Sequence, residues 1–227
     1  MRQVEYNGLN VTEHETLLAR DRILSKIQAL ARVPRAGPLP GFAYTHVCFA
    51  LLTIGDAERL GRIQLSRNLG LGEGTTRTII RHLSNAKVVR TNRQGCSLTA
   101  KGATLYRGLR SRLSKAVPID AKQLALDKTS TAVHVRGGAR KVRRGIEQRD
   151  AAVKIGATGA CTVLVRKGKF VMPMDTEEWG LSKDDPLAIE LNILFHPREE
   201  DVPVIASAAE ENVSNHAAVA ASLTLIY

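Results

Sequence analysis

The sequence predicts an α+β protein of two domains, and three observations support this prediction. The chain has 227 residues, 44% of them hydrophobic, which is enough for two cores of ordinary size. Helical periodicity prevails up to about residue 115, and beyond it apolar runs of strand length alternate with helical stretches. The charge is also uneven: residues 60–115 carry twelve Lys/Arg and one acid, while the rest of the chain is close to neutral.

Composition narrows the classes of protein. No apolar run approaches the roughly 18 residues that a bilayer span requires, so no membrane partner is expected. The polar first residues predict no signal peptide. Cys48, Cys96 and Cys161 are far apart in the sequence. We therefore expect buried thiols in a cytoplasmic protein, with no disulfide, metal site or cofactor.

The first predicted element is an amphipathic helix at residues 12–33. Thr12 is its expected N-cap, and Glu15 completes a capping box. A proline- and glycine-rich linker at 34–41 ends it, so residues 1–41 form one N-terminal unit. The helix either packs on its own domain or joins two copies of the chain. Its apolar stripe contains Leu17, Leu24, Ile27 and Ala31.

The next elements follow one another closely. We expect a buried helix at 43–54, an extended stretch at 60–62, helices at 63–69 and 75–86, strands at 87–91 and 95–98, and a helix at 99–115. A glycine turn at 70–74 separates the second helix from the third, and Thr99 is the expected cap of the last helix. This order is that of a winged helix-turn-helix domain, which we place at residues 42–116.

The helix after the glycine turn has two unlike faces. Its inward face contains Thr76, Ile79, Ile80 and Leu83, whereas its outward face contains Glu73, Gly74, Arg77, Thr78 and Arg81. Arginine and threonine on a slim helix suit the major groove of duplex DNA. The hairpin tip at 92–95 suits a backbone or minor-groove contact. The predicted DNA-binding residues are Arg67, Gly74, Thr75, Arg77, Thr78, Arg81, Asn92, Arg93 and Gln94.

Double-stranded DNA is the predicted partner rather than RNA. Tyr106 is the one aromatic residue between 60 and 115, so the stacking platform typical of single-strand binders is missing.

The stretch "LSRNLGLGEGTTRTIIRHL…VVR…GCSLTAKG" resembles bacterial and archaeal winged-helix regulators. The wider chain, from "GPLPGFAYTHV" through "RRGIEQRDAAVKIGATGACTVLV", resembles an archaeal family in which a winged helix precedes a C-terminal domain of unknown function. The resemblance implies a regulator-like layout with residues 73–85 as recognition helix.

A linker at 117–131 is predicted to lead into a second domain at 132–227. Strands are expected at 131–137, 159–174, 187–197 and 202–208, the second of them a hairpin turning at 167–169, and helices at 139–156 and 210–225. Mixed strands with two helices in so short a segment predict two layers, with a sheet on one side and helices on the other.

The helix at 139–156 suggests an effector site. Val142, Ile146 and Val153 define an expected inward stripe, and Arg149 and Asp150 lie on or beside it. Since buried charges need partners, these two residues form either a structural pair or the wall of a pocket for a small polar effector. The candidate effector-binding residues are Gly137, Gly138, Arg140, Glu147, Arg149 and Asp150.

Enzyme motifs are missing from the sequence. The glycine-rich stretches lack the lysine of a nucleotide-triphosphate loop, and no nucleophile elbow or HExxH motif occurs. We expect the histidines, His134 among them, to be isolated, and the acids at 184–185 and 199–201 to lie in solvated loops. The prediction is a non-enzyme.

Taken together, the sequence predicts a DNA-binding transcription regulator with a C-terminal domain that senses a ligand, dimerises, or does both. A homodimer is expected because one recognition helix reads too few base pairs. Two alternatives remain open: a basic interaction module that binds nucleic acid without sequence preference or an acidic protein, and an enzyme fused to a winged helix.

Overall fold

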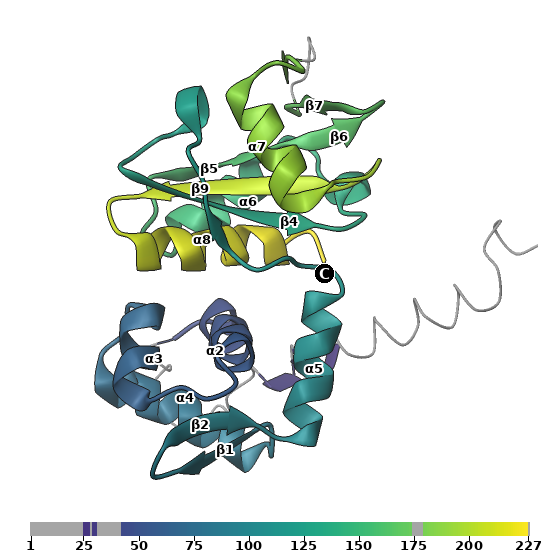
Figure 1. Ribbon diagram of the computed structural model, residues 1–227. Helices are drawn as coiled ribbons and strands as arrows, with labels where there is room; N and C mark the ends of the chain where they lie inside the picture. The colour runs from purple at the N-terminus through teal and green to yellow at the C-terminus, as the bar shows by residue number, and fades with distance from the viewer. Residues whose placement is uncertain (1–24, 28, 31–41, 174–178, 227) are drawn as a thin grey trace, which may run out of the picture.

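The computed structural model describes residues 25–27, 29–30, 42–173 and 179–226 (Figure 1). The fold is α+β, as predicted. Its N-terminal part contains α2 (Tyr44–Asp56), α3 (Arg62–Leu69), α4 (Glu73–Asn85), β1 (Val89–Asn92), β2 (Gly95–Leu98) and α5 (Ala100–Arg110). The chain continues with β3 (Val117–Pro118), η1 (Lys122–Leu124), β4 (Thr129–Val135), η2 (Ala139–Lys141), α6 (Ile146–Val153), β5 (Gly159–Thr162), β6 (Leu164–Arg166), β7 (Lys169–Val171), β8 (Gly180–Leu181), α7 (Pro186–Phe195), β9 (Val202–Ala208) and α8 (Glu211–Leu223).

The N-terminal part is a winged helix, and its local signals act as the sequence predicts. Gly70 ends α3 in the left-handed conformation, at φ 63°. In α4 the predicted inward residues, Thr76, Ile79, Ile80 and Leu83, are all buried. The Thr99 hydroxyl caps α5 by accepting a hydrogen bond from the Gly102 N–H at 3.1 Å.

The wing is a two-stranded hairpin fixed to the start of α3. β1 and β2 pair with Asn92 opposite Gly95, and an isolated β-bridge joins Leu60 to Cys96. Gly95 has a φ of 125°, and a Cβ at this position would lie 2.6 Å from the Leu60 carbonyl oxygen. Only glycine therefore allows the hairpin to approach the residues before α3 so closely.

Part of the predicted N-terminal helix is described, and it packs on the winged helix. Residues 25–27 and 29–30 are helical. Ile27 is fully buried in the same core as α2 and α4, and the His82 imidazole hydrogen-bonds the Leu30 carbonyl. These contacts favour packing within one chain. The predicted cap at Thr12, the residues up to 24 and the linker at 34–41 lie outside the described residues.

The second sheet is antiparallel, with strand order β3-β4-β9-β5. Every residue of β9 is buried, because both faces of this strand are covered. On one face Val133 and Val204 pack with α6 and α8. On the other face Ala132 and Ile205 pack with α7 and with the small sheet β6-β7-β8. Figure 1 shows α7 and α8 on opposite sides of β4 and β9.

The strand predicted at 187–197 is wrong, because this segment forms the helix α7. Its apolar residues have no clear period, which made the segment resemble a buried strand. The start signal was Asp185: its carboxylate accepts a hydrogen bond from the Leu187 N–H at 2.9 Å, and Pro186 occupies the first helical turn. The helix buries Leu187, Ala188 and Leu191 against the sheet.

The helix predicted at 139–156 is shorter than expected. Gly145, at φ 76°, separates η2 from α6, so Val142 is not on the helix. Ile146 and Val153 are 45% and 47% exposed; the predicted inward stripe is therefore wrong. The buried residues of α6 are Gln148 and Ala152.

The segment predicted as a linker at 117–131 is built into the second sheet. β3 pairs with β4 through Val117 opposite Ala132. Ile119 and Leu124 are buried in the core beneath α7. Apolar side chains at this spacing were enough to anchor the segment, although its proline and polar residues are typical of a connection.

The winged helix and the second sheet meet at α8, which packs against α2 and α3 as well as against β4 and β9 (Figure 1). The His216 ring stacks on Phe49 of α2, with centroids 4.7 Å apart, and meets the His46 ring edge-on at 4.5 Å. Burial, with a smaller contribution from His46, lowers the pKa of His216 from 6.5 to about 3.

Two further expectations concern thiols and membranes. Cys48 and Cys96 are buried and Cys161 is half-buried, and all three are free thiols. Among the described residues, no helix combines the length and the apolarity that crossing a membrane requires.

We predict that Gly102→Ala destabilises the protein, because the added methyl group overlaps the Val88 carbonyl oxygen. The expected loss is about 1–3 kcal/mol, typical of overpacking. Gly74→Ala is the matched control: it also lies in a first helical turn but has open space around it, so stability stays equal or rises by up to about 1 kcal/mol. Urea denaturation measures both, and an equal midpoint shift for the two variants contradicts the close approach of α5 to the Val88 carbonyl.

We also predict an acid-sensitive junction at His216. The unfolded chain takes up a proton at this residue below pH 6.5, whereas the folded chain resists protonation until about pH 3. Stability is therefore lost as the pH falls through this window, by about 2 kcal/mol at pH 5 relative to neutral pH. His216→Phe keeps a ring against Phe49 but cannot titrate. Urea midpoints at pH 7 and pH 5 should converge for this variant, and an unchanged pH dependence rules out the assignment.

Candidate nucleic-acid interface

The outer face of α4 presents two guanidinium groups. Arg77 and Arg81 are exposed and one helical turn apart. Thr78, between them, is half-buried, and its hydroxyl donates to the Gly74 carbonyl at 3.1 Å. The threonine hydroxyl is thus bonded within the helix, whereas both arginine side chains are exposed on this face.

A hollow of about 400 Å³ lies between α4 and the wing. Arg62 from α3, Arg77 from α4 and Arg93 from the wing tip all line it, together with Asn92 and Gln94. Four of the predicted DNA-binding residues are thus brought to one surface. Arg62 was missed, although it belongs to the basic segment 60–115. Three like charges from three elements favour an anionic partner.

The wing tip is held by hydrogen bonds of its own. The Gln94 N–H donates to the Asn92 carboxamide oxygen at 2.9 Å. The Arg59 guanidinium donates to the Gln94 carboxamide oxygen. The sequence did not predict a role for Arg59, because its contact with Gln94 exists only once the Leu60–Cys96 bridge brings the two segments together. Asn92 and Gln94 therefore shape the turn, and Arg93 remains exposed at its tip.

Glu73 is the one acid on this face, and it pairs with Arg62 at 3.4 Å. Both side chains are about half exposed, at 53% and 44%, so water weakens the pair and its contribution to stability is small. Its larger effect is on the local field, since it offsets one of the three arginines around the hollow.

The other predicted residues lie at the borders of this surface. Gly74 and Thr75 lie in the first turn of α4, and the space around Gly74 is open. Arg67 is exposed on α3, and its carbonyl oxygen accepts a hydrogen bond at 3.1 Å from Asn212 of α8. Arg67 thus lies near the junction with the second sheet and does not line the hollow.

The candidate effector residues are not gathered into one pocket. The Gly137 N–H already donates to Asp201 at 2.8 Å, and Arg140 pairs with Glu200 at 3.4 Å. Of the six residues, only Arg149 lines the small hollow of about 180 Å³ beside α6.

Arg149 and Asp150 are not buried, contrary to the expectation from the apolar stripe. They pair with each other at 2.9 Å and are 57% and 50% exposed. The reason is the shift of the helix start to Ile146, which rotates the buried face toward Gln148 and Ala152. An exposed pair of neighbours needs no ligand to balance it.

Asp201 is buried, so the expectation of a solvated acid is wrong at this position. Its carboxylate accepts hydrogen bonds from His134 at 2.9 Å and from the N–H groups of Gly137 and Arg198, each at 2.8 Å. Burial lowers the pKa of His134, and Asp201 opposes that shift. His134 also stacks on Phe195 at the end of α7, with centroids 5.5 Å apart. This cluster holds β4, α7 and the loop before β9 together.

Comparison with known families agrees with the two-part layout. Residues 51–104 match the PH0730-like, N-terminal domain family, and residues 126–225 match a domain of unknown function, DUF4443. The hypothetical protein PH0730 from Pyrococcus horikoshii OT3 is similar in structure, with a TM-score of 0.64 and 26% identity over 80% of this chain and 91% of that one. The predicted layout of a winged helix before a domain of unknown function is confirmed at this level.

Other structures are more distant. A MarR family protein of Mycobacterium tuberculosis has a TM-score of 0.30 and 17% identity over 44% of this chain and 69% of its own. An IclR transcriptional regulator from Alicyclobacillus acidocaldarius has a TM-score of 0.25 and 10% identity over 91% of this chain and 96% of its own. At these TM-scores neither bears on the function of this chain. No curated protein matches the sequence.

Proposed function

We propose that this chain is a DNA-binding transcription regulator whose winged helix reads duplex DNA through α4 and the wing. The observation that carries the proposal is the convergence of Arg62, Arg77 and Arg93, from three elements, on one exposed hollow. The segment that holds them, 60–115, carries the whole net positive charge of the chain. A segment with this excess of charge, three of whose arginines meet on one surface, is the pattern expected where phosphates are bound.

The geometry gives each part of the surface a role. α4 is the recognition helix: its outer face is narrow at Gly74 and carries Arg77 and Arg81, which reach guanine edges or phosphates in the major groove. Arg93 at the wing tip contacts the neighbouring backbone. Gly74, Thr75, Thr78 and Arg67 complete the proposed contact surface from the start of α4 and from α3.

In this proposal the rest of the chain joins two copies of the protein, binds a small-molecule effector, or does both. The winged-helix domain covers residues 42–116, and the domain at 132–227 senses a small molecule, dimerises, or does both. Two copies of the recognition helix would read two half-sites, which gives the specificity that one helix lacks.

A second candidate is a module that binds nucleic acid without sequence preference. The wing tip favours this candidate, because the carboxamide oxygens of Asn92 and Gln94 are already hydrogen-bonded, within the turn and to Arg59. If α4 contributes charge alone, binding follows phosphates and not bases. The same basic surface would also accept an acidic protein.

We predict that Arg77→Ala/Arg81→Ala abolishes selection of a preferred duplex. Duplex fragments bound by the purified protein are sequenced, and affinity is then measured over a range of salt concentrations. The wild type should enrich one sequence, and the double variant should lose this enrichment and lower the slope of log affinity against log salt by roughly 2.

The matched control is Lys167→Ala/Lys169→Ala, which removes the same charge from exposed positions around the β6–β7 turn. It should keep both the enrichment and the slope. Binding without enrichment by the wild type would support the nonspecific module, and equal loss in both double variants would show that net charge alone governs binding.

We also predict that Glu73→Gln tightens duplex binding. The change removes the acid that offsets Arg62 at 3.4 Å and should raise affinity about threefold at low salt, with a smaller gain at high salt. Glu147→Gln is the control, because Glu147 also lies in the first turn of a helix, α6, outside this surface, and the change should leave affinity unchanged. A drop in affinity for Glu73→Gln would mean that the carboxylate itself contacts the bases.

A further inference from the structure

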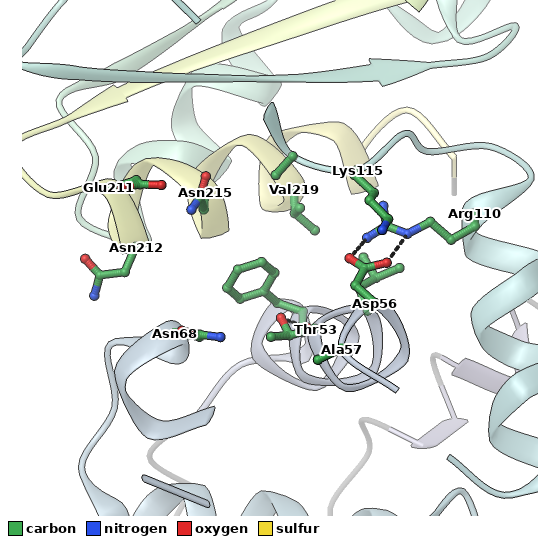
Figure 2. Close-up of a pocket in the computed structure, with 13 residues that line it drawn as sticks. Thr53, Asp56, Ala57, Asn68, Arg110, Lys115, Glu211, Asn212, Asn215 and Val219 are labelled. Carbon is green, nitrogen blue, oxygen red and sulfur yellow. Dashed lines mark hydrogen bonds and ion pairs between the residues drawn. The ribbon is translucent and has the colours of Figure 1, made fainter. Parts of the chain in front are cut away.

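A hollow of about 500 Å³ lies between α2, α3 and α8, where the winged helix meets the second sheet (Figure 2). Thr53 and Asp56 come from α2, Asn68 from α3, and Asn212 and Asn215 from α8. Its volume is within the range of sites for small molecules. The hollow beside α6, near which the sequence placed an effector, has less than half this volume.

The floor of the hollow is apolar and rigid. Phe49, Leu52 and Val219 line it and are at most 7% exposed. The Phe49 ring is held by its stacking on His216, with nearly parallel planes at 4°. A ligand in the hollow would rest its apolar part on this floor.

Three carboxamides line the wall, and the protein fixes the orientation of each. The Asn68 oxygen accepts from Gln64 at 3.1 Å, the Asn212 nitrogen donates to the Arg67 carbonyl at 3.1 Å, and the Asn215 oxygen accepts from Thr131 at 2.9 Å. The opposite atom of each amide has no protein partner within the part of the chain that is described. Two NH₂ groups and one oxygen are thus presented in known orientations.

The charges at the two ends differ in sign. Asp56 and Arg110 form an ion pair, and the Tyr106 hydroxyl also donates to Asp56 at 2.8 Å; this pair is therefore balanced internally. Lys115 and Glu211 are exposed and have no ion-pair partner among the described residues. Figure 2 shows Lys115 at one end of the hollow and Glu211 at the other.

We infer that this hollow binds an extended amino carboxylate, with its carboxylate at Lys115, its ammonium group at Glu211 and its methylene chain on Phe49 and Val219. The hollow follows α8 from Glu211 to Val219, a rise of about 12 Å. The side chains of Lys115 and Glu211 bridge part of this length. A chain that carries its two charges at opposite ends fits the remainder, whereas adjacent charges leave one end unpaired.

A ligand at this place would act on the winged helix, a consequence that rests on the proposed function. The Asn212–Arg67 hydrogen bond already joins α8 to α3, and α3 leads directly into α4. A molecule that contacts α2, α3 and α8 at once favours one placement of the recognition helix over others.

The test uses the full chain and four probes of graded length, each with one charge at either end: 4-aminobutyrate, 5-aminopentanoate, 6-aminohexanoate and 7-aminoheptanoate. At ten times its Kd the best probe should raise the thermal unfolding midpoint by about 3 °C. Hexanoate and hexylamine each lack one charge and should bind at least about tenfold more weakly, as measured by calorimetry.

Lys115→Gln and Glu211→Gln should each weaken binding of the best probe about tenfold or more, because each removes one charge-assisted hydrogen bond. Lys183→Gln and Glu199→Gln are exposed controls outside the hollow and should bind as the wild type does. The inference is overturned if none of the four probes binds, or if the two hollow variants bind them unchanged.

Duplex affinity is measured separately, with and without the best probe. Probe binding by a chain that binds no duplex would contradict the proposed function and leave the site intact. Duplex binding by a chain that binds no probe would contradict the proposed site and leave the proposed function intact.

Discussion

The structure depends on α8, a helix that is buried on all sides from His216 to Leu223. From Ser214 to Leu223 only Asn215 is partly exposed, because the sheet covers one side of the helix and α2 with α3 covers the other. Alanines at 217, 218, 220 and 221 let both layers approach closely. One continuous core therefore runs from Ile27 to Ile226 through this helix, so the winged helix and the second sheet share apolar contacts and are not merely tethered.

The polar first turn of α8 explains where the shared core stops. At Glu211, Asn212 and Asn215 the small apolar residues give way to polar ones, and the hollow opens at this point. The opposite end of the winged helix carries the wing, which Figure 1 places away from α8. The basic surface and the hollow are therefore on different sides of one compact unit.

Local signals accounted for most of the winged helix. These signals are the helical period of Thr76, Ile79, Ile80 and Leu83, the glycine at 70 and the cap at Thr99. Each acts within a few residues, so the structure it specifies does not depend on distant contacts. α7 was mispredicted as a strand because its apolar side chains lie on all sides and show no helical period. Its burial against the sheet favours the helix. At α6 one glycine, Gly145, moved the helix start and with it the buried face.

By itself the sequence determined the α+β class, the winged helix, the outer face of α4 with Arg77 and Arg81, and the confinement of charge to one segment. The tertiary structure alone decided which distant residues meet. Arg59 holds Gln94 across 35 positions, His134 meets Asp201 across 67, and Asn212 reaches Arg67 across 145. Patterns of polarity and charge predicted burial correctly in α4 but not at Asp201 or Arg149, and a contact between segments depends on the packing of whole helices and strands. For this reason the basic segment was found from the sequence, whereas the hollow between α2, α3 and α8 was not.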